Sequence, residues 1–181
     1  MLLSIPYQAL EISKIHLLPF QSDKYGKALA KLQYKDTSVE FNDVSILTPP
    51  MKVIDYNPEN SRLRLDLSQQ FQFQIKMNTL QEYLAGTFYV HQQSFLSQRC
   101  DSSEDIRNMF HFILEGETLS LYIFPTANIR HEDGHITKMS EITPGDMIRC
   151  LIRFNGISQI KTKNGIKLRI QHTVPGIWYL T

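Results

Sequence analysis

Hydrophobic and polar residues alternate over much of the chain, and this alternation predicts β-strands. Residues 62–67 place a leucine at every second position with charged residues between them, and residues 148–154 and 166–170 show a similar alternation. Successive side chains of a strand point to opposite faces, so each segment is predicted to be a strand with one buried face. Residues 71–75 alternate in the same way and are predicted as a further strand.

Turn-forming residues separate these segments. Pairs of Asp or Asn with a following glycine accept positive φ and predict tight hairpin turns. They occur at Asp133-Gly134, Asn155-Gly156 and Asn164-Gly165. Glu115-Gly116-Glu117 predicts another hairpin between two apolar runs. Proline-containing pairs predict strand ends or loops at residues 49–50, 57–58, 144–145 and 175–176.

Helical spacing is confined to two segments. After Lys76, apolar residues recur at helical intervals, at Leu80, Tyr83, Leu84 and Phe88. A second, short helix is predicted near residues 101–110, with Ser102 or Ser103 as its N-cap. About ten short strands with one or two short helices predict an all-β or β-rich fold, expected to be an OB-like Greek-key barrel with insertions; a β-sandwich is the alternative.

Composition adds limits to this picture. The chain has 181 residues, of which 42% are hydrophobic and 20% charged, so we expect one globular domain over residues 1–181 rather than a disordered protein. No apolar run reaches the ~20 residues of a membrane-spanning helix, and no basic region precedes the first apolar stretch. Cys100 and Cys150 are too few to brace a fold of this size. The expectation is an intracellular protein that is neither secreted nor bound to a membrane.

The known signatures of catalysis are missing. The chain has no nucleophile elbow, P-loop, dinucleotide-binding glycine pattern or C-x-x-C motif. His131 and His135 flank Asp133-Gly134 and superficially resemble a metal cluster, but a hairpin turn with polar flanks explains them better. We therefore predict that the protein is not an enzyme and has no metal site or cofactor. A hydrolase whose residues come together only in the fold is left open.

Positive charge is concentrated near the end of the sequence. Between residues 147 and 172 no acidic residue occurs, and the cations there are Arg149, Arg153, Lys161, Lys163, Lys167 and Arg169. If the strands of 148–154 and 166–170 pair, four of these cations share one outer face. Like charges on one face repel each other unless an anion binds, and phosphate backbones are a common anion. The alternative is an ordinary solvated face.

Further candidate contacts lie elsewhere in the sequence. Arg62 and Arg64 occupy the polar face of their strand, and Tyr122 with Phe124 lies opposite the leucines of residues 119–123. Those two rings are either buried or offered to a ligand. Tyr56 lies in a polar segment, and Trp178 is near the end of the sequence. Arginines bind phosphates and exposed rings stack on nucleobases. These six residues are therefore added to the predicted nucleic-acid-binding set.

Two stretches of the chain resemble a known family. The first is the segment at 45–53, Ser-Ile-Leu-Thr-Pro-Pro-Met-Lys-Val, followed after a polar loop by the strand at 62–67; the second runs from Pro144-Gly145-Asp146 through residues 148–154 and 165–169 to Ile177-Trp178. This order resembles the OB-fold single-stranded DNA-binding proteins of large eukaryotic DNA viruses, which are distantly similar to those of short-tailed phages. The resemblance implies a viral replication protein in the host cytoplasm or nucleus, with Arg149, Arg153, Lys167 and Arg169 as backbone contacts. The acidic tail with which the phage proteins recruit replication proteins is missing.

The resulting hypothesis is that the protein binds single-stranded DNA with little sequence preference, by phosphate contacts and base stacking, in replication, recombination or repair. Replication proteins are possible further partners, and a homo-oligomer is possible. The main alternative is a viral structural or assembly β-sandwich that contacts other proteins through its exposed rings. A factor that binds duplex DNA or RNA is the third alternative.

Overall fold

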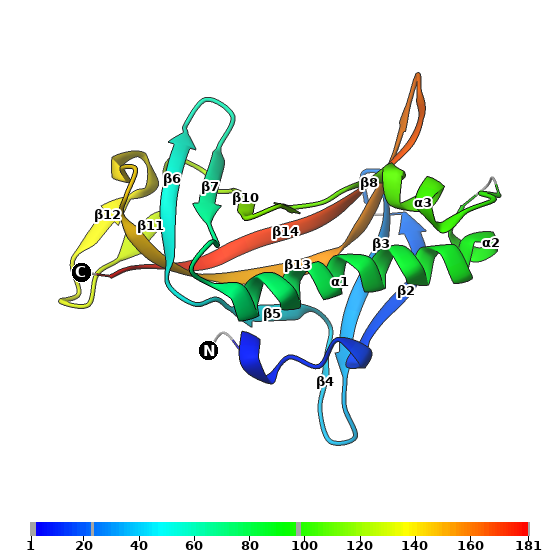
Figure 1. Cartoon of the computed structure of the whole chain (residues 1–181), viewed down its shortest axis with the longest axis horizontal. Helices are drawn as coiled ribbons and strands as arrows, with labels where there is room; N and C mark the ends of the chain where they lie inside the picture. Colours follow the sequence, from blue (N-terminus) through cyan, green and yellow to red (C-terminus); the bar gives the residue numbers. More distant parts are fainter. Residues whose placement is uncertain (1–2, 23, 97–98, 181) are drawn as a thin grey trace.

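The computed structural model describes residues 3–22, 24–96 and 99–180, and these residues fold around one large, strongly curved mixed sheet (Figure 1). The predicted β-rich, barrel-like fold is confirmed. The strands are β1 (Ile5–Pro6), β2 (Ile15–Ser22), β3 (Ala28–Lys35), β4 (Glu40–Phe41), β5 (Val44–Leu47), β6 (Met51–Asn57), β7 (Arg62–Asp66), β8 (Phe110–His111), β9 (Leu114–Glu115), β10 (Thr118–Tyr122), β11 (Asn128–Arg130), β12 (Ile136–Lys138), β13 (Met147–Thr162) and β14 (Gly165–Leu180). The α-helices are α1 (Phe71–Val90), α2 (Gln92–Phe95) and α3 (Ser103–Met109), with 3-10 turns η1 (Tyr7–Ala9), η2 (Ile12–Lys14) and η3 (Met139–Glu141).

The long hairpin of β13 and β14 forms the axis of the molecule (Figure 1). On its other edge, β13 pairs in turn with β6, β5 and β3. The other edge of β14 pairs in parallel with β8 and, further along, with β11. Five other strands of the sheet therefore pair directly with one hairpin, namely β3, β5, β6, β8 and β11.

Two glycines predicted to end strands instead lie inside this hairpin. Gly156 is part of β13, where a Cβ would collide with the carbonyl of Ala30 on β3, so glycine is required by the close approach of two backbones. Gly176 is part of β14, where a Cβ would lie 2.6 Å from the ring of Trp178. Pro175 falls at a register shift, where its missing N–H breaks no ladder bond. The hairpin turn predicted at 155–156 and the strand end predicted at 175–176 are therefore wrong.

The predicted hairpin turns at 115–117, 133–134 and 164–165 are confirmed, because each joins two antiparallel strands. The short helix near 101–110 is confirmed as α3. Ser102 is its N-cap, and its hydroxyl accepts from the backbone N–H of Asp105.

Helix α1 begins earlier and is longer than predicted. Residues 71–75 form its first turns, so the strand predicted there is wrong: Phe73 is buried, whereas Phe71 and Ile75 are exposed. The buried positions follow helical spacing, and they are Phe73, Met77, Leu80, Gln81, Leu84, Ala85 and Phe88. The alternation of five residues was too short to distinguish a strand from a helix.

Buried Gln81 fastens α1 to the edge of the sheet. Its Oε1 accepts from the backbone N–H groups of Ile113 and Leu114, at 3.1 and 3.0 Å, and its Nε2 donates to the carbonyl of Leu114. One amide side chain thus satisfies three backbone groups that would otherwise be buried without partners. It also fixes Ile113, which lines the cavity described below.

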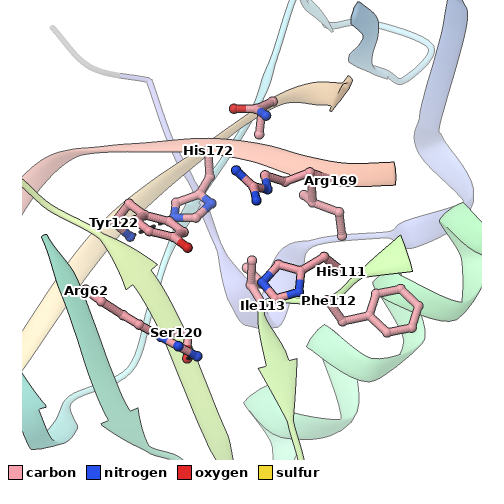
Figure 2. A pocket seen from close by; sticks show the side chains of 10 residues that line it. Arg62, His111, Phe112, Ile113, Ser120, Tyr122, Arg169 and His172 are labelled. Carbon is pink, nitrogen blue, oxygen red and sulfur yellow. Dashed lines mark hydrogen bonds between the residues drawn. The ribbon is translucent and has the colours of Figure 1, made fainter. Parts of the chain in front are cut away.

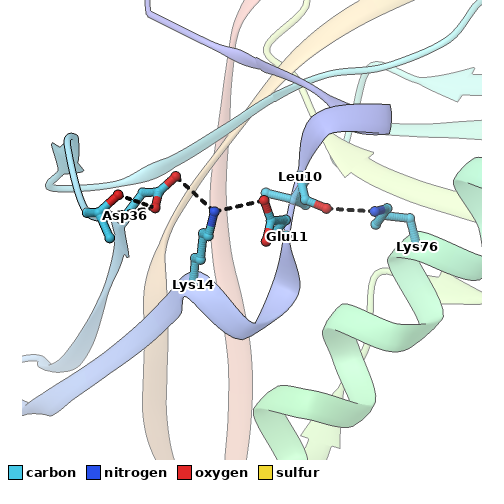
Figure 3. Close-up of polar contacts among 6 residues, drawn as sticks. Leu10, Glu11, Lys14, Asp36 and Lys76 are labelled. Atoms are coloured by element: carbon cyan, nitrogen blue, oxygen red, sulfur yellow. Dashed lines mark hydrogen bonds and ion pairs between the residues drawn. The ribbon is translucent and has the colours of Figure 1, made fainter.

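On its other side, α1 holds the N-terminal segment (Figure 3). Lys76 Nζ donates to the carbonyl of Leu10 at 2.6 Å, and Tyr83 Oη donates to that of Ile15 at 2.8 Å. Between them, Lys14 bridges the carboxylates of Glu11 and Asp36, at 2.7 and 2.8 Å. These contacts raise the pKa of Lys14 and lower that of Asp36.

Candidate nucleic-acid interface

The cations predicted to share one face lie in separate places. Although β13 and β14 pair, Arg149 lies opposite Trp178 and Arg153 opposite Thr173, whereas Lys167 and Arg169 lie opposite Ile160 and Ser158. The assumed register paired residues 148–154 with 166–170, but the strands of this hairpin extend well beyond the two alternating segments. The expectation of four cations over one surface is therefore wrong.

Three of the predicted residues have partners within the protein. Arg64 forms a bidentate ion pair with Asp55, which lowers the pKa of that carboxyl. Arg153 Nε lies 3.4 Å from Asp43 Oδ2 and 3.4 Å from Ser45 Oγ. Tyr56 belongs to β6 rather than a polar loop, and its hydroxyl donates to the carbonyl of Ile123 at 2.7 Å. These three residues serve the fold.

Three other predicted residues come together at one cavity (Figure 2). Arg62 of β7, Tyr122 of β10 and Arg169 of β14 all line a hollow of about 170 Å³. The remaining lining residues are His111, Phe112, Ile113, Ser120, Ile170, Gln171 and His172. We call this hollow the arginine–histidine cavity. Its lining contains two arginines and two histidines and no carboxylate.

Strand pairing explains how these side chains meet. Arg62 lies opposite Tyr122 in the β7–β10 pair, with Leu63 and Leu121 turned into the core. His111 lies opposite Arg169 in the parallel β8–β14 pair. Residues in register on neighbouring strands point to the same face. The cavity therefore lies where these two strand pairs adjoin.

The donors of Arg62 are incompletely used. Its Nη2 donates to Ser120 Oγ at 3.2 Å, whereas its Nε is buried and has no partner among the described residues. Arg169 is exposed and forms no ion pair within the described part of the chain. A buried donor without an acceptor is costly, so the guanidinium of Arg62 keeps unused hydrogen-bonding capacity at the edge of the cavity.

His172 connects the two sides of the cavity. Its Nε2 accepts from the backbone N–H of Tyr122 at 3.1 Å, and its ring lies 6.1 Å from that of Tyr122. Burial lowers the pKa of His172, and a hydrogen bond to the backbone of Ile170 acts in the opposite direction. The ring is thus a neutral acceptor that holds β10 against β14. Because its nitrogens are engaged with backbone groups, it suits positioning rather than general base catalysis.

Two exposed rings lie at the end of β10, and one of them, Tyr122, lines the cavity. Tyr122 is 45% exposed and Phe124, just after β10, is 76% exposed. The sequence left open whether these two rings are buried or exposed, and the structure shows that both are exposed. Flat exposed rings next to unpaired cations are the combination that binds single strands.

Three predicted lysines gather at the end of the long hairpin. Lys161, Lys163 and Lys167 are all exposed around the turn at 164–165, which projects from the body of the molecule (Figure 1). Within residues 3–22, 24–96 and 99–180, none of the three forms an ion pair. We call this group the hairpin lysines.

Arg149 and Trp178, the remaining predicted residues, line a second cavity of about 540 Å³ at the far end of β14. Arg130 also lines it. No sequence pattern marked Arg130, because its proximity to Trp178 depends on parallel pairing of segments far apart in the chain.

Metal-binding geometry is not found in the described ranges, where no three His, Cys, Asp or Glu side chains are placed to hold an ion. His131 instead stacks on Tyr179, with ring centroids 4.6 Å apart. No described helix is long and apolar enough to cross a membrane. Both cysteines are buried and unbridged.

Comparisons of the chain with protein-family models, curated proteins and solved structures gave no match.

Proposed function

We propose that this protein binds single-stranded DNA with little sequence preference, with the arginine–histidine cavity receiving a backbone phosphate. The observation that carries the proposal is the meeting of Arg62, Tyr122 and Arg169, from three strands, at a hollow lined by no carboxylate. A volume of about 170 Å³ is below the ~300–1,000 Å³ of ordinary ligand pockets. It suits one phosphate group better than a whole nucleotide.

The surroundings of the cavity suit a single strand better than a duplex. Tyr122 and Phe124 offer ring faces that only unpaired bases can reach. The guanidinium groups of Arg62 and Arg169, which both line the cavity, provide charge-assisted donors for phosphate oxygens. Base stacking and phosphate contact together explain affinity without sequence preference.

Fluorescence anisotropy of a labelled oligo-dT strand at several salt concentrations tests this proposal. Replacing both arginines (R62Q with R169Q) is expected to weaken binding at least tenfold. It should also reduce the log–log salt slope by about 0.7, since the cavity receives one phosphate and each phosphate contact on a single strand contributes ~0.7. K52Q with R107Q is the matched control, because it also removes two charges and both residues are exposed and line neither cavity.

Competition with duplex DNA and RNA distinguishes the alternatives. Equal competition by duplex would contradict the role of the exposed rings. The assembly alternative rests on Phe124, whose 76% exposure equally suits a protein contact. Concentration-dependent self-association by analytical ultracentrifugation, lost in F124S and accompanied by no DNA affinity, would favour that alternative.

A further inference from the structure

A row of three side chains crosses the sheet at the end of β14 farthest from the hairpin turn. Trp178 is in register with Arg149 on β13 at one side and with Arg130 on β11 at the other. Cross-strand partners in register share a face, so the side chain of Trp178 projects from the same face as those of two arginines, one on each neighbouring strand. We call this group the Arg-Trp-Arg row.

The position of the indole is held by its own strand. The Trp178 ring lies over Gly176, so close that a Cβ there would be 2.6 Å from the ring. A ring held in this way loses little conformational freedom when a ligand stacks on it. This gives Gly176 a role beyond the turn that its pairing with Pro175 suggested.

Neither arginine of the row forms an ion pair with a residue that the structure describes. The Nε of Arg149 is buried without a hydrogen bond among the described residues, and Arg130 is exposed with no ion pair in the same ranges. Glu132 also lines the cavity, yet it forms no ion pair with either arginine. The row therefore combines a ring with two cations that no described carboxylate neutralises, and all three residues line a cavity of about 540 Å³.

We infer that the Arg-Trp-Arg row is a second nucleotide-binding site, in which a base stacks on Trp178 while Arg130 and Arg149 bind its phosphates. The volume lies within the range of pockets that enclose a small organic ligand, whereas the arginine–histidine cavity is large enough only for a phosphate. This inference rests on the proposed function, because it assigns the second site to the same strand of DNA.

The spacing of the two sites is compatible with one strand. Arg169 and Trp178 are nine residues apart on β14, which at ~3.3 Å per residue is at most about 30 Å. Domains that bind single strands in this way cover ~4–16 nucleotides each. One strand of such length can therefore contact both sites.

The chain's single tryptophan makes the second site directly observable. Tryptophan emission should be quenched saturably as unlabelled oligo-dT is added, at concentrations matching those of the anisotropy titration. R130Q and R149Q should each weaken this binding at least fivefold, whereas R107Q should change it by less than twofold. Arg130 is exposed, so R130Q keeps the test valid if R149Q fails to fold, as judged by circular dichroism.

The outcomes separate the two proposals. Binding by anisotropy without any change in emission would overturn the second site and leave the proposed function intact. Quenching by the mononucleotide dTMP at the same concentrations as by the oligonucleotide would also overturn it, by identifying a pocket for free nucleotides. Failure of the oligonucleotide to bind in either measurement would overturn both proposals.

Discussion

At the scale of single residues, His172 is the contact on which the arginine–histidine cavity depends. Its unprotonated Nε2 accepts from Tyr122 and so holds one wall of the cavity to the other. Burial lowers the pKa of this imidazole, which means that the folded protein favours the neutral ring. Stability from this source is therefore complete above the unfolded-state pKa near 6.5 and is lost as the pH falls through the lower, folded-state pKa.

The resulting prediction concerns pH. The free energy of unfolding in urea should fall between pH 7.5 and pH 5, and the fall should be smaller in H172Q, which keeps an acceptor but cannot be protonated. Asp36 and Asp55 do not interfere, since the pKa of each lies below 3.8 and their contributions are lost only at lower pH. An NMR titration placing the pKa of His172 at or above 6.5 would contradict the prediction.

Site residues could be predicted from the sequence only as far as residue type and strand face allow. Arg62, Tyr122 and Arg169 were found because each occupies the polar face of an alternating strand. His172 and Arg130 were missed, because one depends on a hydrogen bond across 50 residues and the other on parallel pairing with β14. Arg64 shows the reverse error, since its partner Asp55 cannot be inferred from spacing alone.

At the scale of elements, two glycines with different surroundings make a matched test. Gly86 is exposed in the middle of α1, and a Cβ there meets nothing within 4 Å. G86A should raise the free energy of unfolding by about 0.5–1 kcal/mol, because glycine loses more conformational entropy than alanine in a helix. Thermal unfolding should shift upwards by about 1–4 °C.

Gly156 provides the opposite expectation. Its Cβ would collide with the backbone of β3, so G156A should lower the free energy of unfolding by about 1–3 kcal/mol. Both variants can be measured in the same denaturant series. An unchanged midpoint for G156A would show that β3 and β13 separate easily, contrary to the pairing described.

Local signals at this scale were reliable where a short motif determines the structure. The turns at 115–117, 133–134 and 164–165 and the cap at Ser102 depend on neighbouring residues and were predicted. The turn predicted at 155–156 is wrong because Gly156 is required by a close contact with the backbone of Ala30, which is far away in the sequence. Register likewise depends on the full lengths of β13 and β14, which the alternation revealed only in part.

At the scale of the whole molecule, the hairpin lysines line neither of the two cavities and suit a role in electrostatic attraction. Replacing all three with glutamine (K161Q, K163Q and K167Q) should weaken oligo-dT binding to a similar degree for all base sequences. If each lysine meets one phosphate, the log–log salt slope should fall by about 2, at ~0.7 per contact. Anisotropy at low and high salt measures both effects.

The control is a variant with the same loss of charge elsewhere. Lys35, Lys52 and Arg107 are exposed and line neither cavity, so their joint replacement with glutamine removes three charges without touching the candidate sites. An equal reduction of the slope in both triple variants would show that net charge, and not position, matters.

The central position of β13 has a consequence for synthesis. Strands β3, β5 and β6 all align against residues 147–158, which leave the ribosome long after those strands have emerged. A nascent chain that ends before residue 147 therefore leaves the edges of these strands without their pairing partner. Such long-range pairing is slow to form and prone to aggregation until it is complete. Stalled or truncated translation products should consequently depend on chaperones, whereas the finished chain should not.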